Sequence, residues 1–209
     1  GLYQVSGAYG FRDQLQDAMA IVSTEPGLVR EHILRCAARQ FPEGDALHWW
    51  HEPAVGVRTK ITDDRLFLPW ATARYVKVTR DEDVLRERVN YLRGDPVPRG
   101  VKNVYRAYEA GFETDSLLAH CLNAIESTEL SPDGIALLKG GDWNDGIDEA
   151  GEKGTGTSTF TTMLLYRVIT DFLPYVHERT ARERLIRLRE KARGGIDKAW
   201  RGNGYVRLT

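Results

Sequence analysis

The stretch FRDQLQDAMAIV, residues 11–22, decides the fold class that this sequence predicts. Apolar residues recur in it at intervals of three or four: Phe11, Leu15, Met19 and Val22. This is the spacing of one face of an α-helix. The segment EPG follows at residues 25–27 and is expected to end the helix. We therefore predict a helix over residues 10–23.

The same periodicity recurs along most of the chain. Further helices are expected over residues 28–40, 63–78, 115–126 and 158–173. Two segments have the form of a capping box and are expected to begin two more helices: Thr79-x-x-Glu82 and Thr180-x-x-Glu183. The last helix is expected to break near Gly194 and Gly195. The sequence thus predicts an all-α fold of about seven helices.

Long polar segments join the expected helices, at residues 41–62, 94–114 and 139–157. Loops of this length in a compact all-α domain are usually functional. The chain begins with Gly1 rather than Met and closes on a strand-like run, so we expect a piece of a longer protein, cut at both ends.

Charge and composition exclude several functions. The formal net charge of −1 gives no electrostatic reason to bind nucleic acid or an anionic membrane surface. Apolar runs stay well short of the roughly 18–20 residues of a membrane span, and no signal peptide is apparent. Cys36 and Cys121 lack paired spacing, so we expect reduced thiols and a cytoplasmic location.

The loop GGDWNDG, residues 140–146, holds two carboxylates, an indole and an amide between glycines. Gly and Asn permit a tight turn that presents Asp and Trp side chains to a cavity. An indole accepts the apolar face of a pyranose ring, and a carboxylic acid beside it can protonate a leaving oxygen. The loop therefore indicates a sugar site, although on composition alone a surface turn rich in Asp and Asn is the more frequent case.

Two other segments concentrate polar groups. Arg12 and Asp13 open the first helix, where an acid also simply suits the positive end of the helix dipole. His48 and His51 have no third ligand at a recognisable spacing, so we predict no metal site. Arg58 and Asp64 follow, and a charged pair of this kind can hold sugar hydroxyls.

Five motifs together resemble glycoside hydrolase family 94, the inverting glucoside phosphorylases. The motifs are YQVSGAYGFRDQLQD (3–17), RQFPEGD (39–45), HWWH (48–51), VRTKITDD (57–64) and GDWNDG (141–146). The residues in these motifs are most similar to those of the β-1,2-glucan branch of the family, and the resemblance covers residues 1 to about 170. Sequence GTSTF at residues 156–160 departs from the family's Gly-Glu-Ser-Val-Trp and makes acceptor preference uncertain.

The resemblance implies an (α/α)6 barrel. On this basis residues 1–209 are the N-terminal half or more of one catalytic domain, and the phosphate-binding residues lie beyond residue 209. The chain alone is then expected to be inactive and to need the remainder of its domain. The resemblance also implies a cytoplasmic enzyme or the cytoplasmic domain of a membrane-bound synthase, with a homodimer as one assembly state.

The resemblance also assigns roles to individual residues. Asp145 is implied as the general acid, with Trp143 lining the site beside it. Arg58 and Asp64 are implied to hold the glucosyl unit in the donor subsite. The expected neighbours of these groups are Asp63, Arg12 and Asp13.

One acid without a base suits phosphorolysis, because inorganic phosphate is already an anion and attacks the anomeric carbon directly. Phosphate is the co-substrate and no cofactor is expected. Asp145 must then hold a proton near neutral pH, so we expect its pKa to be raised by burial or by Asp142.

Two alternatives stay open at this stage. An inverting hydrolase would need a second carboxylate, either Asp64 or one beyond residue 209. A non-catalytic glucan-binding or structural segment is the other alternative, because an incomplete barrel exposes apolar helix faces. Phosphate dependence separates the two enzymes.

Overall fold

The computed structural model describes residues 7–151 and 153–206. These residues contain six α-helices: α1 (Phe11–Ile21), α2 (Pro26–Ala37), α3 (Phe67–Thr79), α4 (Leu117–Glu126), α5 (Thr159–Phe172) and α6 (Arg179–Ala199). Short 3-10 turns lie at Asp64–Leu66, Asp83–Arg86, Asp145–Gly151 and Leu173–Tyr175. Within the described residues, no helix combines the length and the apolar stretch that crossing a membrane requires.

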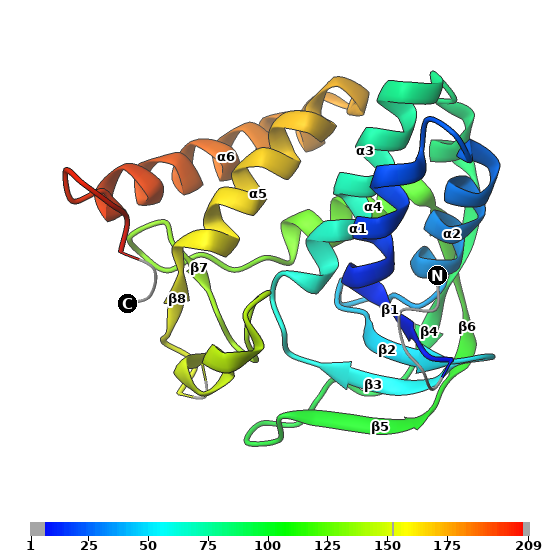
Figure 1. Cartoon of the computed structure of the whole chain (residues 1–209), viewed down its shortest axis with the longest axis horizontal. Coiled ribbons are helices and arrows are strands. Elements are labelled where there is room, and N and C mark those ends of the chain that lie inside the picture. Colours follow the sequence, from blue (N-terminus) through cyan, green and yellow to red (C-terminus); the bar gives the residue numbers. More distant parts are fainter. Residues whose placement is uncertain (1–6, 152, 207–209) are drawn as a thin grey trace.

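Eight β-strands accompany the helices in the described part of the chain. Strands β1 (Tyr9–Gly10), β2 (Leu47–His51), β3 (Val55–Thr59) and β5 (Asn103–Ala107) form an antiparallel sheet in that order. Strands β4 (Arg88–Arg93) and β6 (Glu109–Ser116) form a two-stranded sheet, as do β7 (Ala136–Leu137) and β8 (Thr157–Ser158). Figure 1 shows the four-stranded sheet across one end of helices α1, α2 and α3.

The prediction of an all-α fold, and with it of about half of an (α/α)6 barrel, is therefore wrong. The structure is a mixed α/β fold with six helices and three antiparallel sheets among its described residues. Helices expected over residues 10–23, 28–40, 115–126 and 158–173 are confirmed within a few residues at each end. The expected helix at 63–78 is confirmed as α3, preceded by the turn Asp64–Leu66.

The strands lie in segments that look like polar loops. Residues 41–62 contain the hairpin of β2 and β3, and residues 94–114 contain β5 and most of β6. Strands β5 and β6 are largely exposed, so they lack the alternation of apolar and polar residues that marks a half-buried strand. Pairing with neighbouring strands, rather than burial, defines these segments.

The helix expected after Thr79 is also wrong. Thr79 ends α3, and Arg80 follows in a left-handed conformation with φ of 64°. A single 3-10 turn leads into β4, in which Val89 and Tyr91 alternate toward the interior. Apolar spacing over this short segment fits a strand as well as a helix.

Helix α6 begins one residue before the expected capping box. Its N-cap is Glu178, whose carboxylate accepts hydrogen bonds from the backbone N–H groups of Thr180 and Ala181. The expected break at Gly194 and Gly195 is not found, and the helix runs on to Ala199. Gly195 instead allows close approach, because a Cβ there would meet the backbone of Gly134.

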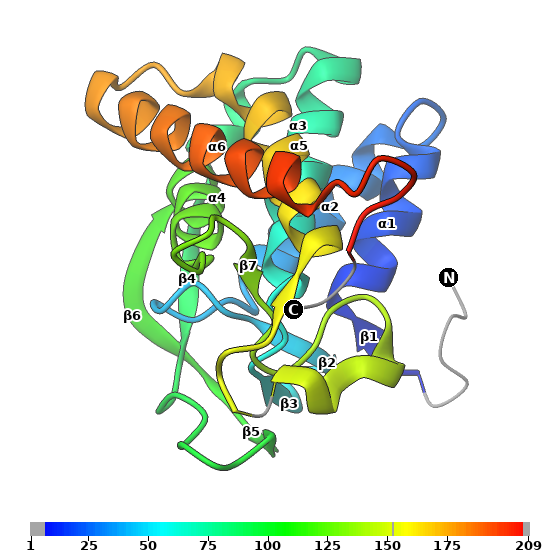
Figure 2. The ribbon, with the colours of Figure 1, turned by 90° about the vertical axis from the view of Figure 1, so that its left-hand side faces the viewer.

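Helix α3 is the centre of the helical layer and contacts α1, α2, α4 and α5. Fully buried apolar side chains fill the space between them: Phe11, Leu15, Ile33, Leu68, Leu117, Ile125 and Leu165. Three polar segments meet where this layer ends against the sheet, namely the start of α1, the turn before α3 and the loop at 139–151. Figure 2 shows that loop beside strands β1, β2 and β3.

Candidate active site

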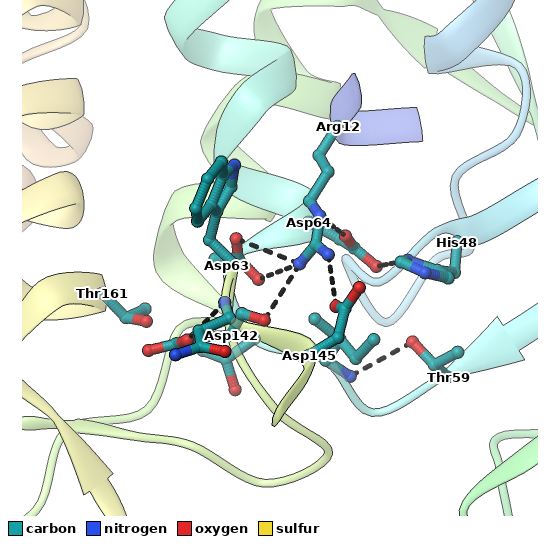
Figure 3. Close-up of polar contacts among 12 residues, drawn as sticks. Arg12, His48, Thr59, Asp63, Asp64, Asp142, Asp145 and Thr161 are labelled. Atoms are coloured by element: carbon teal, nitrogen blue, oxygen red, sulfur yellow. Dashed lines mark hydrogen bonds and ion pairs between the residues drawn. The ribbon is translucent and has the colours of Figure 1, made fainter. Parts of the chain in front are cut away.

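A buried arginine organises the candidate site. Arg12 lies in the first turn of α1, and its side chain is 5% exposed. Its Nη2 donates to Asp145 Oδ1 at 2.6 Å, and its Nη1 donates to Asp63 Oδ1 at 3.3 Å. Nη1 also donates to the backbone carbonyl of Asp142 at 3.1 Å. One guanidinium therefore ties α1 to the turn before α3 and to the loop at 139–151, as Figure 3 shows.

Asp63 and Asp64 stand at the entrance to α3, and both are buried. Asp64 Oδ2 lies 2.8 Å from His48 Nδ1 on β2, whereas Asp64 Oδ1 lies 3.7 Å from Arg12 Nε. Neither Asp64 Oδ1 nor Arg12 Nε has a hydrogen-bond partner among the described residues. Buried polar atoms without a hydrogen-bond partner are rare in folded proteins, and a role in a functional site is one explanation for those that occur.

Asp142 anchors the loop that carries Asp145. Its carboxylate is buried and accepts hydrogen bonds from Ser158 Oγ at 2.6 Å and from the Asn144 backbone N–H at 2.9 Å. Ser158 in turn caps helix α5 through the Thr161 backbone N–H. The loop is therefore fixed to the start of α5, and the second half of GGDWNDG projects from this anchor.

The carboxylates outnumber the cations in this cluster. Burial, followed by the neighbouring Asp64 carboxylate, raises the pKa of Asp63. Burial likewise raises the pKa of Asp13, whose Oδ1 lies 3.7 Å from Arg12 Nε. Burial alone would lower the pKa of Arg12, but Asp64, Asp63 and Asp145 outweigh it and raise that pKa. The Asp64 carboxylate raises the pKa of His48, which favours an imidazolium–carboxylate pair.

Asp145 and Trp143 face solvent. The Asp145 side chain is 77% exposed, so the burial expected for a general acid is not found. Trp143 is 51% exposed, and its Nε1 donates to Gln16 Oε1 at 3.4 Å. A cavity of about 400 Å³ opens beside Asp145, with β2, β3 and the glycines of the loop as its walls. An exposed carboxyl at an open cavity can exchange a proton with a ligand, and the exposed indole on the same loop offers it an apolar surface.

Arg58 lies apart from this cluster. Its guanidinium binds both carboxylate oxygens of Asp45 at 2.7 Å and Glu43 at 2.8 Å, and it covers the ring of Phe41. The expected charged pair between Arg58 and Asp64 is therefore absent, because Asp64 pairs with His48 instead. A direct role of Arg58 in holding a sugar stays a prediction.

The structure brings together five of the residues that the sequence singled out: Arg12, Asp13, Asp63, Asp64 and Asp145. Sequence reasoning missed the roles of His48, Asp142 and Ser158. The sequence pattern suggests His48 only as a candidate metal ligand. The described part of the chain contains no group of three His, Cys, Asp or Glu side chains placed to bind a metal. Ser158 lies in the GTSTF segment, at the position of the Ser in the pattern Gly-Glu-Ser-Val-Trp.

Comparison with known protein families assigns the chain to one of them. The model of the glycosyl hydrolase 94 superfamily catalytic domain matches residues 1–209. The chain therefore belongs to this family.

Three relatives are similar to the chain. Cyclic β-(1,2)-glucan synthase NdvB of Rhizobium meliloti (strain 1021) is 39% identical, over 98% of this chain and 8% of that protein. Solabiose phosphorylase of Paenibacillus borealis is 28% identical, over 94% of the chain and 23% of that protein. The 3-O-β-D-glucopyranosyl-β-D-glucuronide phosphorylase of the same organism is 24% identical, over 93% and 24% respectively. The chain thus spans less than a quarter of the length of each relative.

The pair of His48 and Asp64 predicts a pH-dependent contribution to stability. Because the pKa of His48 is raised, the pair contributes fully below the unfolded-state pKa of about 6.5, and this contribution is lost as pH rises through the folded-state pKa. We expect His48→Gln to lower the free energy of unfolding by about 1–3 kcal/mol near pH 6 and by less near pH 9. Urea unfolding at the two pH values measures this difference.

His51→Gln is the matched control, because it removes an imidazole from the same strand, one that packs edge-on against the Trp49 ring. If His48→Gln lowers the free energy of unfolding equally at both pH values, the imidazole acts by packing rather than by charge.

Proposed function

We propose that the full-length protein phosphorolyses β-glucosides with inversion, and that β-1,2-linked glucan is its substrate. The products are α-glucose 1-phosphate and a shortened glucan. Membership of the glycosyl hydrolase 94 family supports the reaction class, and two of the relatives are phosphorylases by name. The relative with 39% identity is a β-(1,2)-glucan synthase, which supports the linkage.

The observation that carries the proposal is the contrast between two carboxylates at the cavity. Asp145 is exposed to it, whereas the Asp142 carboxylate is buried and engaged with Ser158 and Asn144. An inverting hydrolase needs a second carboxylate to activate water on the opposite face of the sugar, about 6.5–9.5 Å from the acid. A single available acid suits a reaction in which phosphate brings its own negative charge.

In the proposed reaction a phosphate oxygen attacks the anomeric carbon from the face opposite the glycosidic oxygen. The new carbon–oxygen bond forms as the old one breaks, and the Asp145 carboxyl transfers its proton to the departing oxygen. Arg12 keeps Asp63 and Asp64 as partners when Asp145 takes up the proton, so its charge stays compensated.

Other residues support this chemistry by position. Trp143 offers an exposed indole in the same loop as Asp145, suited to the apolar face of a pyranose. We propose that Asp64 holds the donor sugar. Its neighbours then hold the side chains that contact this sugar, and they are Asp63, Arg12 and Asp13. Inorganic phosphate is the co-substrate, and the proposal requires no further cofactor.

Phosphate dependence tests the reaction class. The full-length protein is incubated with β-1,2-linked glucose oligosaccharides, with and without inorganic phosphate, and α-glucose 1-phosphate and free glucose are measured. We expect α-glucose 1-phosphate to appear only with phosphate, and cellobiose to react more slowly. Release of free sugar at the same rate without phosphate would show a hydrolase instead. No release from any β-glucoside would favour a binding or structural segment.

Asp145→Asn tests the acid. The amide keeps the shape of the side chain but cannot donate a proton of comparable acidity, so we expect phosphorolysis to fall by about 10²–10⁴-fold. Asp133→Asn is the matched control, because that side chain is 80% exposed and also makes one ion pair, with Lys198. Near-normal release of α-glucose 1-phosphate by Asp145→Asn would show that Asp145 is not the general acid.

A further inference from the structure

An aromatic row, formed by Trp49 and Tyr105 with Val57 between them, crosses strands β2, β3 and β5 of the four-stranded sheet. The register pairs Trp49 on β2 with Val57 on β3, and Val57 with Tyr105 on β5. Residues that face one another across neighbouring strands lie on the same side of a sheet. The rings of Trp49 and Tyr105 are accordingly close, with centroids 5.5 Å apart and an angle of 38° between their planes.

This aromatic pair is unlike the other aromatic residues of β2. Trp50 points to the opposite face, where it is fully buried and stacks on Tyr9 at 5.3 Å. Trp49 is only partly buried, and Tyr105 is 57% exposed. Keeping two large rings partly in water costs hydrophobic free energy that burial would recover, so the pair is not explained by packing of the core.

The aromatic row is continuous with the candidate active site. Trp49 and Val57 line the same cavity of about 400 Å³ as Asp145. Polar side chains of His48, Thr59 and Asn103 line it beside them. An aromatic surface bordered by polar groups matches a pyranose ring, which has apolar faces and hydroxyl groups around its edge.

We propose that Trp49 and Tyr105 form a platform that binds glucose units beyond the bond that is cleaved. The inference rests on the proposed phosphorolysis. Release of glucose 1-phosphate requires the transferred glucose to be the non-reducing end of the chain, because no other position of that glucose is substituted in the product. The remaining units must then extend away from Asp145 on the side of the departing oxygen, and the platform assigns them to the aromatic row, which starts at the cavity that Asp145 lines. The platform makes the enzyme prefer oligosaccharides over the disaccharide.

The test compares two substrates in two variants of the full-length protein. Trp49→Ala and Tyr105→Ala are assayed with the β-1,2-linked disaccharide and pentasaccharide of glucose. We expect each variant to raise KM for the pentasaccharide about 3- to 10-fold more than KM for the disaccharide, as expected for one lost aromatic contact. The kcat for the pentasaccharide should change less than twofold, and Tyr105→Phe should restore the lower KM.

Phe112→Ala is the matched control, because this aromatic side chain is 97% exposed but lies on β6, in the two-stranded sheet that β6 forms with β4. Equal effects of Tyr105→Ala on both substrates, or no effect, would overturn the platform. If the wild-type protein releases no glucose 1-phosphate, the proposed function fails, and calorimetric titration of the pentasaccharide decides the platform separately. Weaker pentasaccharide binding by Tyr105→Ala than by Phe112→Ala would then support it, and equal binding would exclude it.

Discussion

The burial of one guanidinium constrains the whole candidate site. A charge removed from water must be compensated by partners, and Arg12 finds them in three segments that are far apart in the sequence. Its contacts with Asp63 and with Asp145 fix the turn before α3 and the loop at 139–151 against the first turn of α1. The position of Asp145 is therefore set by Arg12 as well as by its own loop.

The same arrangement places the acids in different surroundings. Asp63 lies deepest and has a raised pKa, Asp64 is paired with His48, and Asp145 alone among the partners of Arg12 is largely exposed. Asp145 is therefore the carboxylate of this cluster that solvent reaches most readily. Trp49, at one end of the aromatic row on β2 and β5, lines the same cavity as Asp145, so the row and the exposed carboxylate border one cavity.

Sequence reasoning located the helices and most of the acid cluster, but it missed the sheets. Helices such as α1 bury a continuous face, and this leaves a period of three to four in the sequence. Strands β5 and β6 bury little and leave no comparable pattern. Arg58 and Asp64 are close in sequence, yet Arg58 pairs with Asp45 and Asp64 pairs with His48, each more than ten residues away. Such pairings depend on tertiary structure, and one sequence does not reveal them.

A crystal structure of the full-length Asp145→Asn protein with a β-1,2-linked glucose trisaccharide tests the central claim most directly. The account predicts that the glycosidic oxygen of the terminal glucose lies within hydrogen-bond distance of residue 145. The following glucose units should extend along the aromatic row of β2 and β5. A trisaccharide bound away from residue 145, with the Arg12 cluster unchanged and no sugar in the cavity, would contradict it.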